Sequence, residues 1–466
     1  MNSKQLIKKI IFYSSIIIMS IIIIGYIYAI YKFPSITKDS GYYLKISYDL
    51  ANNLSFYNGL NCSYTPMAMY LLSIPFYFMN DVGLDFIFAF FLFFYIIIGL
   101  LFYRLSFYFN KDYRINIFST FLLVSLLLSL EGFHILLEPF VLLFQISSIL
   151  ILLKYNASNK SLILVGFFVF LSFFSKQYGL FVFPAIVYFI FQSSKKYKRF
   201  IKKICFLIAG ILFPLIVFVL YFFVYKNIEF TNLMSQLLGI QVFNGDEIVT
   251  DVNYSFKGFV KNIKRVIKLF PFFIFYIFLI PLAIKRKLTT NTVFSLLLFF
   301  GSVLTLIFAY WLHYFQLIIP YAILTVISLP QNVLKKYSLL FGVCFIVFVK
   351  ASYNEFNRAV NKKETLYNRQ KLTVNILDEY LKKADNVYLH GISASYYFLC
   401  KYNSPNYQIL GYKFPEELTL KKIDNSLSRG DYIIINSKQI SMQYVIDYEF
   451  ITKFLYANKE LTVLKK

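Results

Sequence analysis

The chain has 466 residues, of which 59% are hydrophobic and only 15% are charged. Soluble domains carry about a quarter of charged residues, so this composition excludes an ordinary soluble protein and indicates a polytopic membrane protein. The formal net charge is +24, but the basic residues form short clusters between apolar runs, as they do in cytoplasmic loops. That distribution argues against a nucleic-acid-binding protein.

The first apolar run covers residues 10–31 and follows the basic segment MNSKQLIKK. It is long enough to cross about 30 Å of hydrocarbon, and its basic flank predicts a cytoplasmic N-terminus. A cleaved signal peptide would have a shorter apolar core that ends in small residues. Because this run ends in YAIYKFP, we interpret it as a retained span.

Later apolar runs predict further spans and bring the expected number to about eleven. They cover residues 85–104, 115–133, 139–154, 161–175, 180–192, 204–225, 266–284, 292–310, 315–329 and 337–350. Residues 66–79 contain Pro75 and are short for a crossing, so we expect an interfacial or re-entrant helix there. The basic clusters then fall on the side of the N-terminus, as the positive-inside rule requires. These clusters are at 104–114, 195–203, 285–287 and 335–336.

The pattern changes near residue 354. The expected elements are a charged amphipathic helix at 361–383, a buried strand at 386–391 (NVYLHG), a helix at 414–427 and a strand at 431–437 (DYIIINS). This alternation predicts a small α/β domain at 354–466, after a transmembrane domain at 1–353 whose first external loop covers 32–84. The expected number of spans places the small domain outside the cytoplasm. No Gly-rich loop follows either strand, so nucleotide binding has little support.

The four cysteines, Cys62, Cys205, Cys344 and Cys400, show no metal-ligand spacing. Unpaired thiols are the simpler interpretation. A bridge between Cys62 and Cys400 stays open if both residues face an oxidising compartment.

The predicted topology collects a set of polar residues at the outer mouth of the membrane part. They are Asp39, His134, Glu138, Lys176, Gln177, Lys261, Lys264, Arg265, Lys268, His313 and Gln316. Two acids with several cations suit a reaction in which a hydroxyl group is deprotonated and a phosphate leaves. Transport of a charged substrate would use the same residues.

Several of these residues also have a structural interpretation. Asp39 opens a tyrosine-rich juxtamembrane stretch, and it could be a solvated acid or the N-cap of a helix starting at Gly41. Glu138 precedes a proline and could favour the dipole of a helix start. Lys176 and the basic residues at 261–268 could extend toward lipid headgroups.

His313 could be an interfacial hydrogen-bonding residue. A divalent metal is the one cofactor that the sequence leaves open. It would have to be bound by acids distant in sequence, with Asp39 and Glu138 as the candidates.

Four short motifs occur in order along the membrane part. The first contains Asp39, Tyr43, Gly59, Tyr64 and Pro66; the others are HILLEPF with Glu138, FFSKQYG with Lys176 and WLHYFQLIIP with His313 and Pro320. In these motifs the chain resembles the C-type (GT-C) polytopic membrane glycosyltransferases that use polyprenyl-phosphate sugars, such as protein O-mannosyltransferases and lipid A aminoarabinose transferases. Ser40, Thr65 and Glu138 depart from the pattern, in which many members carry an acid, a proline and an aspartate.

The resemblance implies an inverting transfer of a sugar from a polyprenyl-phosphate donor to a glycan, lipid or protein acceptor. The reaction would take place on the outer face of the inner membrane, with Asp39 as the general base. The implied substrate-binding residues are Tyr43, Tyr64, Glu138, Lys176, Gln177, Arg265, His313 and Gln316. The expected partners are the lipid-linked donor, the acceptor and membrane lipids, and no nucleic acid.

Two other functions remain open. One is a non-enzymatic flippase or transporter of a lipid-linked saccharide, although we find no internal repeat of the kind that many transporters show. The other is a surface-glycan polymerase. The C-terminal domain could bind the acceptor or only pack against the rest of the chain.

Overall fold

The computed structural model describes residues 3–52, 55–56, 59–60, 65–79, 82–194, 196–225, 256–284, 288–308, 311–383, 385–389, 393, 395–402, 428–436, 448–456 and 459–466. The chain divides into two compact units. The first, here called the helical unit, comprises Met1–Tyr31, Phe88–Tyr225 and Val252–Val360. The second, here called the mixed unit, comprises Lys32–Ile87, Lys226–Asp251 and Asn361–Lys466, so the segment after the first helix belongs with the C-terminal residues.

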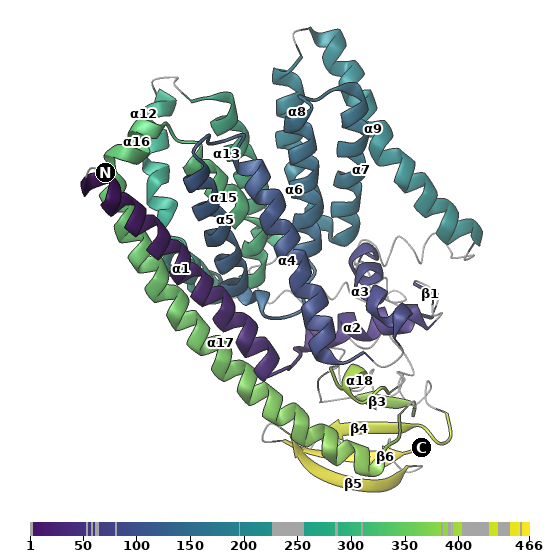
Figure 1. Ribbon diagram of the computed structural model, residues 1–466. Helices are drawn as coiled ribbons and strands as arrows, with labels where there is room; N and C mark the ends of the chain where they lie inside the picture. The colour runs from purple at the N-terminus through teal and green to yellow at the C-terminus, as the bar shows by residue number, and fades with distance from the viewer. Residues whose placement is uncertain are drawn as a thin grey trace. The chain divides into compact units, whose positions relative to one another are not determined.

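The helical unit is built from apolar helices that are linked by short irregular turns (Figure 1). Its α-helices are α1 (Ser3–Lys32), α4 (Leu84–Ser106), α5 (Tyr113–Leu127), α6 (Glu138–Lys154), α7 (Asn159–Ser175), α8 (Phe183–Gln192), α9 (Tyr197–Val219), α11 (Phe256–Leu269), α12 (Leu279–Ile284), α13 (Thr290–Val303), α14 (Thr305–Phe308), α15 (Ile319–Ile327), α16 (Gln331–Lys336) and the first part of α17 (Ser338–Tyr380). Between them lie the π-helical turns η1 (Leu128–Gly132) and η3 (Leu220–Tyr225) and the 3-10 turns η2 (Gln177–Val182), η4 (Pro271–Phe278) and η5 (Leu312–Leu317).

Local chemistry fixes where several of these helices begin. Proline occupies one of the first two positions of α6, α8 and α15, where its missing N–H group would have had no partner within the helix. Asp112 and Ser158 cap α5 and α7, each accepting a hydrogen bond from a backbone N–H group of the first turn.

Among the described residues, five helices are long and apolar enough to cross a membrane by themselves. The bent pair Gly258–Leu269 and Pro271–Leu282, with an angle of 82° at its break, makes a sixth if it counts as one span. Each of the predicted spans falls on a helical segment, which confirms the polytopic α-helical architecture. Because several of these segments are shorter than a full crossing, the number of eleven spans stays a prediction.

Helices α6, α7 and α9 pack side by side in the helical unit (Figure 1). The contact between α7 and α9 is made at Gly166 and Gly210. Small residues at such a contact allow two backbones to approach closely, which is a common way of joining helices in a membrane.

The mixed unit combines short helices with a four-stranded sheet (Figure 1). Its helices are α2 (Lys38–Ala51), α3 (Met67–Phe78), α18 (Ser395–Leu399) and the end of α17, and the two-residue strands β1 (Ser55–Phe56) and β2 (Gly59–Leu60) pair in parallel. The sheet has the order β3 (Val387–Leu389), β4 (Tyr432–Asn436), β6 (Lys459–Lys465), β5 (Glu449–Tyr456). Strands β3 and β4 are parallel, and the other two pairs are antiparallel.

The core of the mixed unit joins the sheet to α17. Val387 of β3, Ile434 of β4 and Val463 of β6 are fully buried and pack with Leu377 of α17. The two predicted strands are therefore confirmed as β3 and β4, whereas the helix predicted at 414–427 lies outside the described residues.

Two features of this region differ from the sequence prediction. The amphipathic helix predicted at 361–383 is the end of α17, a single helix of 43 residues that starts in the last predicted span. Strands β5 and β6 were not predicted. The short helix expected at 66–79 is present as α3, with Pro75 inside it.

The described cysteines Cys205, Cys344 and Cys400 are free thiols. Cys62 lies outside the described residues.

Candidate functional site

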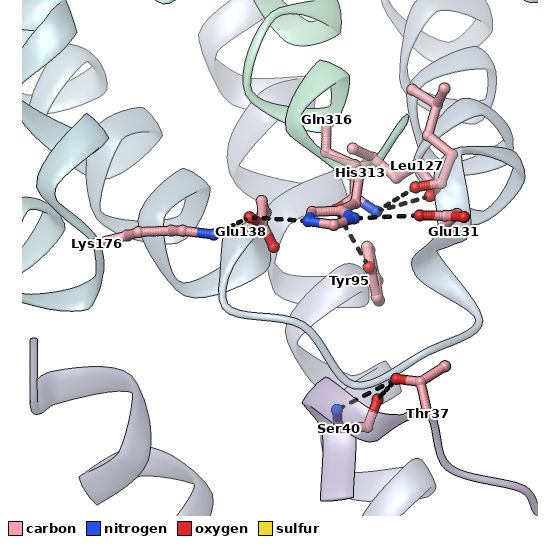
Figure 2. A network of polar contacts seen from close by, with 10 residues as sticks. Thr37, Ser40, Tyr95, Leu127, Glu131, Glu138, Lys176, His313 and Gln316 are labelled. Atoms are coloured by element: carbon pink, nitrogen blue, oxygen red, sulfur yellow. Dashed lines mark hydrogen bonds and ion pairs between the residues drawn. The ribbon is translucent and has the colours of Figure 1, made fainter. Parts of the chain in front are cut away.

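A network of charged side chains lies inside the helical unit (Figure 2). Its most buried part is an ion pair in which the Lys176 ammonium group donates to Oε1 of Glu138 at 2.6 Å. The two side chains are only 5% and 1% exposed. Burying charges in an apolar bundle costs free energy that a hydrophobic pair would not, so the presence of this pair calls for a reason other than stability.

The local fold explains why these two residues meet. Glu138 is the first residue of α6, followed by Pro139, and an acid is favoured at this end of a helix by the helix dipole. Lys176 ends α7 in an extended conformation before η2 begins. Its ammonium group also lies over the ring of Tyr314, 4.2 Å from the centroid, where the electron-rich face attracts a cation.

His313 of η5 lies between two carboxylates. Its Nδ1 atom is 3.1 Å from Oε2 of Glu131, and its Nε2 atom is 4.0 Å from Oε1 of Glu138 (Figure 2). The imidazole therefore links the ion pair to a second acid, so that Glu131, His313, Glu138 and Lys176 form one continuous network of charged and ionisable groups.

Glu131 was not among the residues singled out from the sequence. It lies at a kink in η1, where Leu130 and Glu131 depart from helical geometry. Its left-handed backbone conformation, φ 68°, costs a residue with a side chain about 1 kcal/mol or more. Backbone conformations of this kind cluster at functional sites. The signal that could have revealed it is an acid within the apolar run SLLLSLEGF, inside a predicted span.

The Gln316 side chain connects η5 to η1 through hydrogen bonds. Its amide nitrogen donates to the carbonyl oxygens of Leu130, at 2.9 Å, and Leu127, at 3.3 Å. The Tyr95 hydroxyl donates to the amide oxygen at 3.5 Å. Gln316 is fully buried, so its described role is to hold the backbone that carries Glu131.

The structure thus brings together four of the predicted substrate-binding residues, namely Glu138, Lys176, His313 and Gln316. Gln177 is adjacent to them and opens η2. Arg265 has another partner: Nε donates to Oε1 of Glu355 at 3.1 Å and Nη2 to Oε2, and Glu355 also pairs with Arg358. Its part in substrate binding stays a prediction.

The other predicted site residues belong to the mixed unit. Asp39 is exposed in the first turn of α2, and Tyr43 is buried in the same helix. The interpretation of Asp39 as an N-cap is wrong, because α2 begins at Lys38 and Thr37 is the cap. The Thr37 hydroxyl accepts from the backbone N–H of Ser40 at 3.2 Å, and the two hydroxyl groups share a hydrogen bond of 2.8 Å (Figure 2). Tyr64 lies outside the described residues.

Among the residues that the structure describes, Asp39 and Glu138 belong to no cluster of metal-ligating side chains. In the described part of the chain, no group of three or more His, Cys, Asp or Glu side chains is arranged to hold a metal ion. Oε1 of Glu138 is already engaged by the Lys176 ammonium group.

No family model matches the chain, and no curated protein matches it in sequence. Two solved structures resemble it along almost its whole length. ArnT from Cupriavidus metallidurans in the apo state has a TM-score of 0.62 at 11% sequence identity, and the match covers 96% of this chain and 97% of that one. ArnT bound to undecaprenyl phosphate has a TM-score of 0.59 at 10% identity, with the same coverage.

At this level of identity the likeness concerns the fold. ArnT is a lipid A aminoarabinose transferase of the GT-C class, so the resemblance predicted from the sequence motifs is confirmed for the architecture. The chain has the fold of the GT-C polytopic membrane glycosyltransferases.

Proposed function

We propose that this protein is a membrane glycosyltransferase that transfers a sugar from a polyprenyl-phosphate donor. The observation that carries the proposal is the network of Glu131, His313, Glu138 and Lys176, whose central ion pair is buried, within a fold shared with a transferase that was crystallised with undecaprenyl phosphate. A network of charges inside apolar helices is costly, and membrane proteins retain such groups chiefly for function.

The proposed reaction is an inverting displacement. Asp39 accepts the proton of the acceptor hydroxyl, the oxygen attacks the anomeric carbon, and the bond between that carbon and the phosphate oxygen breaks. The exposed position of Asp39 in the first turn of α2 leaves its carboxylate open to an acceptor. General-base catalysis of this kind contributes roughly a hundred-fold to ten-thousand-fold to a rate.

The leaving group is a lipid phosphate, whose negative charge increases as the bond breaks. The Lys176 ammonium group, held by Glu138 and Tyr314, is the cation that we assign to this charge. A cation fixed in advance stabilises the developing charge without having to reorganise during the reaction. His313 orients Glu138 from the other side, through its link to Glu131.

We further propose that the reaction takes place on the outer face of the inner membrane, with a cytoplasmic N-terminus and the C-terminal residues outside. The basic clusters that fall together on the side of the N-terminus support this orientation. The acceptor is a glycan, a lipid or a protein.

The test uses the purified protein and a panel of undecaprenyl-phosphate sugars that differ in the sugar. One of them should raise the temperature of unfolding, since a ligand at 100 times its Kd adds about 2.7 kcal/mol to the free energy of unfolding. In the presence of acceptor lipids or glycans, the same compound should release undecaprenyl phosphate. Stabilisation without release would favour a flippase, and failure of the whole panel to stabilise the protein would contradict the proposal.

A further inference from the structure

A short extended segment leads into the helix that carries Asp39. Residues 34–37 follow α1 without regular secondary structure. The Ser35 N–H donates to the Phe33 carbonyl oxygen at 2.7 Å, and the Thr37 carbonyl oxygen accepts from the Gly41 N–H of α2 at 2.9 Å, but the groups between them have no ladder or helix to pair with. Ser35 and Ile36 are nevertheless buried, at 0% and 1% exposure. Buried backbone groups need partners, and here the side chains of a distant helix supply them.

Gln370 of α17 pairs with both backbone groups of Ile36. Its amide oxygen accepts from the Ile36 N–H at 3.2 Å, and its amide nitrogen donates to the Ile36 carbonyl oxygen at 2.6 Å. The side chain thus takes the place of a neighbouring strand. Because both bonds come from one planar amide, they fix the direction of the segment as well as its position.

Lys363, about two turns earlier on α17, fastens the preceding residue. Its ammonium group donates to the Ser35 carbonyl oxygen at 3.2 Å, and the Ser35 hydroxyl donates back to the Lys363 carbonyl oxygen at 3.3 Å. Lys363 is fully buried. An ammonium group is rarely kept away from water unless its position serves a purpose.

The same amide of Gln370 reaches α18, where its nitrogen lies 3.4 Å from Oγ of Ser395. Helix α2 touches α18 at this residue, since a Cβ atom added to Gly41 would lie 2.3 Å from the Cα atom of Ser395. Gln370 therefore holds the segment just before the cap of α2, and Ser395 contacts the helix just after it. Thr37 and Asp39 lie between these two points of attachment.

We infer that Gln370 is a positioning residue for Asp39, and that the C-terminal residues of the mixed unit hold the proposed catalytic base in position. The inference rests on the proposed function of Asp39. It assigns the end of α17 and α18 a defined task in the reaction, in place of acceptor binding or simple packing.

The variant that tests it is Gln370→Met, which keeps the length of the side chain and loses both hydrogen-bonding groups. Asn368→Ala is the matched control, because Asn368 is an exposed amide residue on the same helix. Hydrogen exchange of the full-length protein should become at least about ten-fold faster at the Ile36 N–H and in the first turn of α2, as their bonds open more often, and stay unchanged in β4 and β6. The control should exchange like the wild type.

Turnover is measured with the undecaprenyl-phosphate sugar that stabilises the protein most. A displaced base should lower kcat about ten-fold to a hundred-fold and leave the KM for the donor nearly unchanged, because a misplacement of about 1 Å is enough for such a loss. A general loss of structure would instead raise the KM and speed exchange in the sheet, which would overturn the positioning role.

Asp39→Asn separates this proposal from the proposed function. If Asp39→Asn abolishes turnover while Gln370→Met keeps full kcat, the positioning role is wrong and the base stands. If Asp39→Asn keeps full turnover, the assignment of the base falls, and the inference falls with it. Unchanged exchange at Ile36 in Gln370→Met would refute the two-bond attachment regardless of any activity.

Discussion

Gly166 of α7 and Gly210 of α9 lie where the two backbones are so close that neither position has room for a side chain. A Cβ atom on Gly166 would be 2.2 Å from the carbonyl oxygen of Leu207, and one on Gly210 would be 2.1 Å from that of Ile163. Gly166 thus faces the α9 backbone about one turn before Gly210, and Gly210 faces the α7 backbone about one turn before Gly166. Lys176 directly follows α7, so this contact helps to fix the helix from whose end the ammonium group reaches Glu138.

Gly166→Ala should therefore destabilise the protein by about 1–3 kcal/mol, the usual cost of overpacking a tight contact. The matched control is Gly342→Ala in α17, where an added Cβ atom meets nothing within 4 Å. Thermal unfolding in detergent checks both. Equal melting temperatures for the two variants would show that α7 and α9 are not in the described contact.

Glu138→Gln should be strongly destabilising, because it leaves the Lys176 ammonium group buried without its carboxylate. Breaking one side of a buried pair costs roughly 3–5 kcal/mol. The double variant Glu138→Gln with Lys176→Met removes both charges and should regain most of that stability. It should not regain turnover, since the cation assigned to the leaving phosphate is gone. A double variant with normal turnover would remove the pair from the mechanism.

The strain at Glu131 predicts an inverted order of stability for two substitutions. In a regular helix, glycine is less stable than alanine by about 1 kcal/mol. At φ 68° the order should reverse, and Glu131→Gly should unfold at a higher temperature than Glu131→Ala. Both variants lose the contact with His313 at 3.1 Å, so both should lose turnover to a similar degree. A more stable alanine variant would contradict the left-handed conformation.

Asp39→Asn should lower kcat about a hundred-fold to ten-thousand-fold with little change in thermal stability. The matched control is Asp85→Asn, because Asp85 is also an exposed acid in the first turn of a helix. Asp49 of α2 is unsuitable as a control, since it is buried and paired with Lys45. Equal losses in the Asp39 and Asp85 variants would indicate a general effect of surface charge.

Asp49 gives a prediction for the pH dependence of stability. Burial raises the pKa of its carboxyl group to about 6, although Lys45, with its ammonium group at 2.8 Å, opposes the shift. The unfolded chain titrates near 3.8, so between these values the folded protein binds more protons than the unfolded chain. The free energy of unfolding should therefore fall as the pH rises from about 4 to about 6. Asp49→Asn should remove this part of the slope in urea unfolding curves; an unchanged slope would exclude Asp49 as its source.

The sequence was informative where the signal is local. Apolar runs marked the helices, NVYLHG and DYIIINS marked two buried strands, and the order of four motifs predicted the architecture. Pro139 beside Glu138 indicated the start of α6 within one residue. These features depend on neighbours in the chain, which a sequence displays directly.

The features that the sequence did not predict depend on contacts between residues far apart in the chain, or on a choice between neighbouring residues with similar properties. The contact between Glu131 and His313 joins positions 182 residues apart, and no periodic pattern in the sequence indicates it. Thr37, and not Asp39, is the N-cap of α2. Both residue types are suitable caps, and only the path of the preceding segment decides between them. The hairpin of β5 and β6 lacks a strong turn signal, since Ala457 and Asn458 separate the strands.

The attachment of Ile36 to Gln370 has a consequence for how the protein is made. The two residues are 334 positions apart, so the segment before α2 leaves the ribosome long before the helix that holds it. Until α17 and α18 have been synthesised, the stretch that carries Asp39 lacks the contacts that hold it in position. On the proposed role of Asp39, a nascent or prematurely terminated chain that lacks the end of α17 cannot hold the base in position. We therefore expect transfer only from chains synthesised through α18.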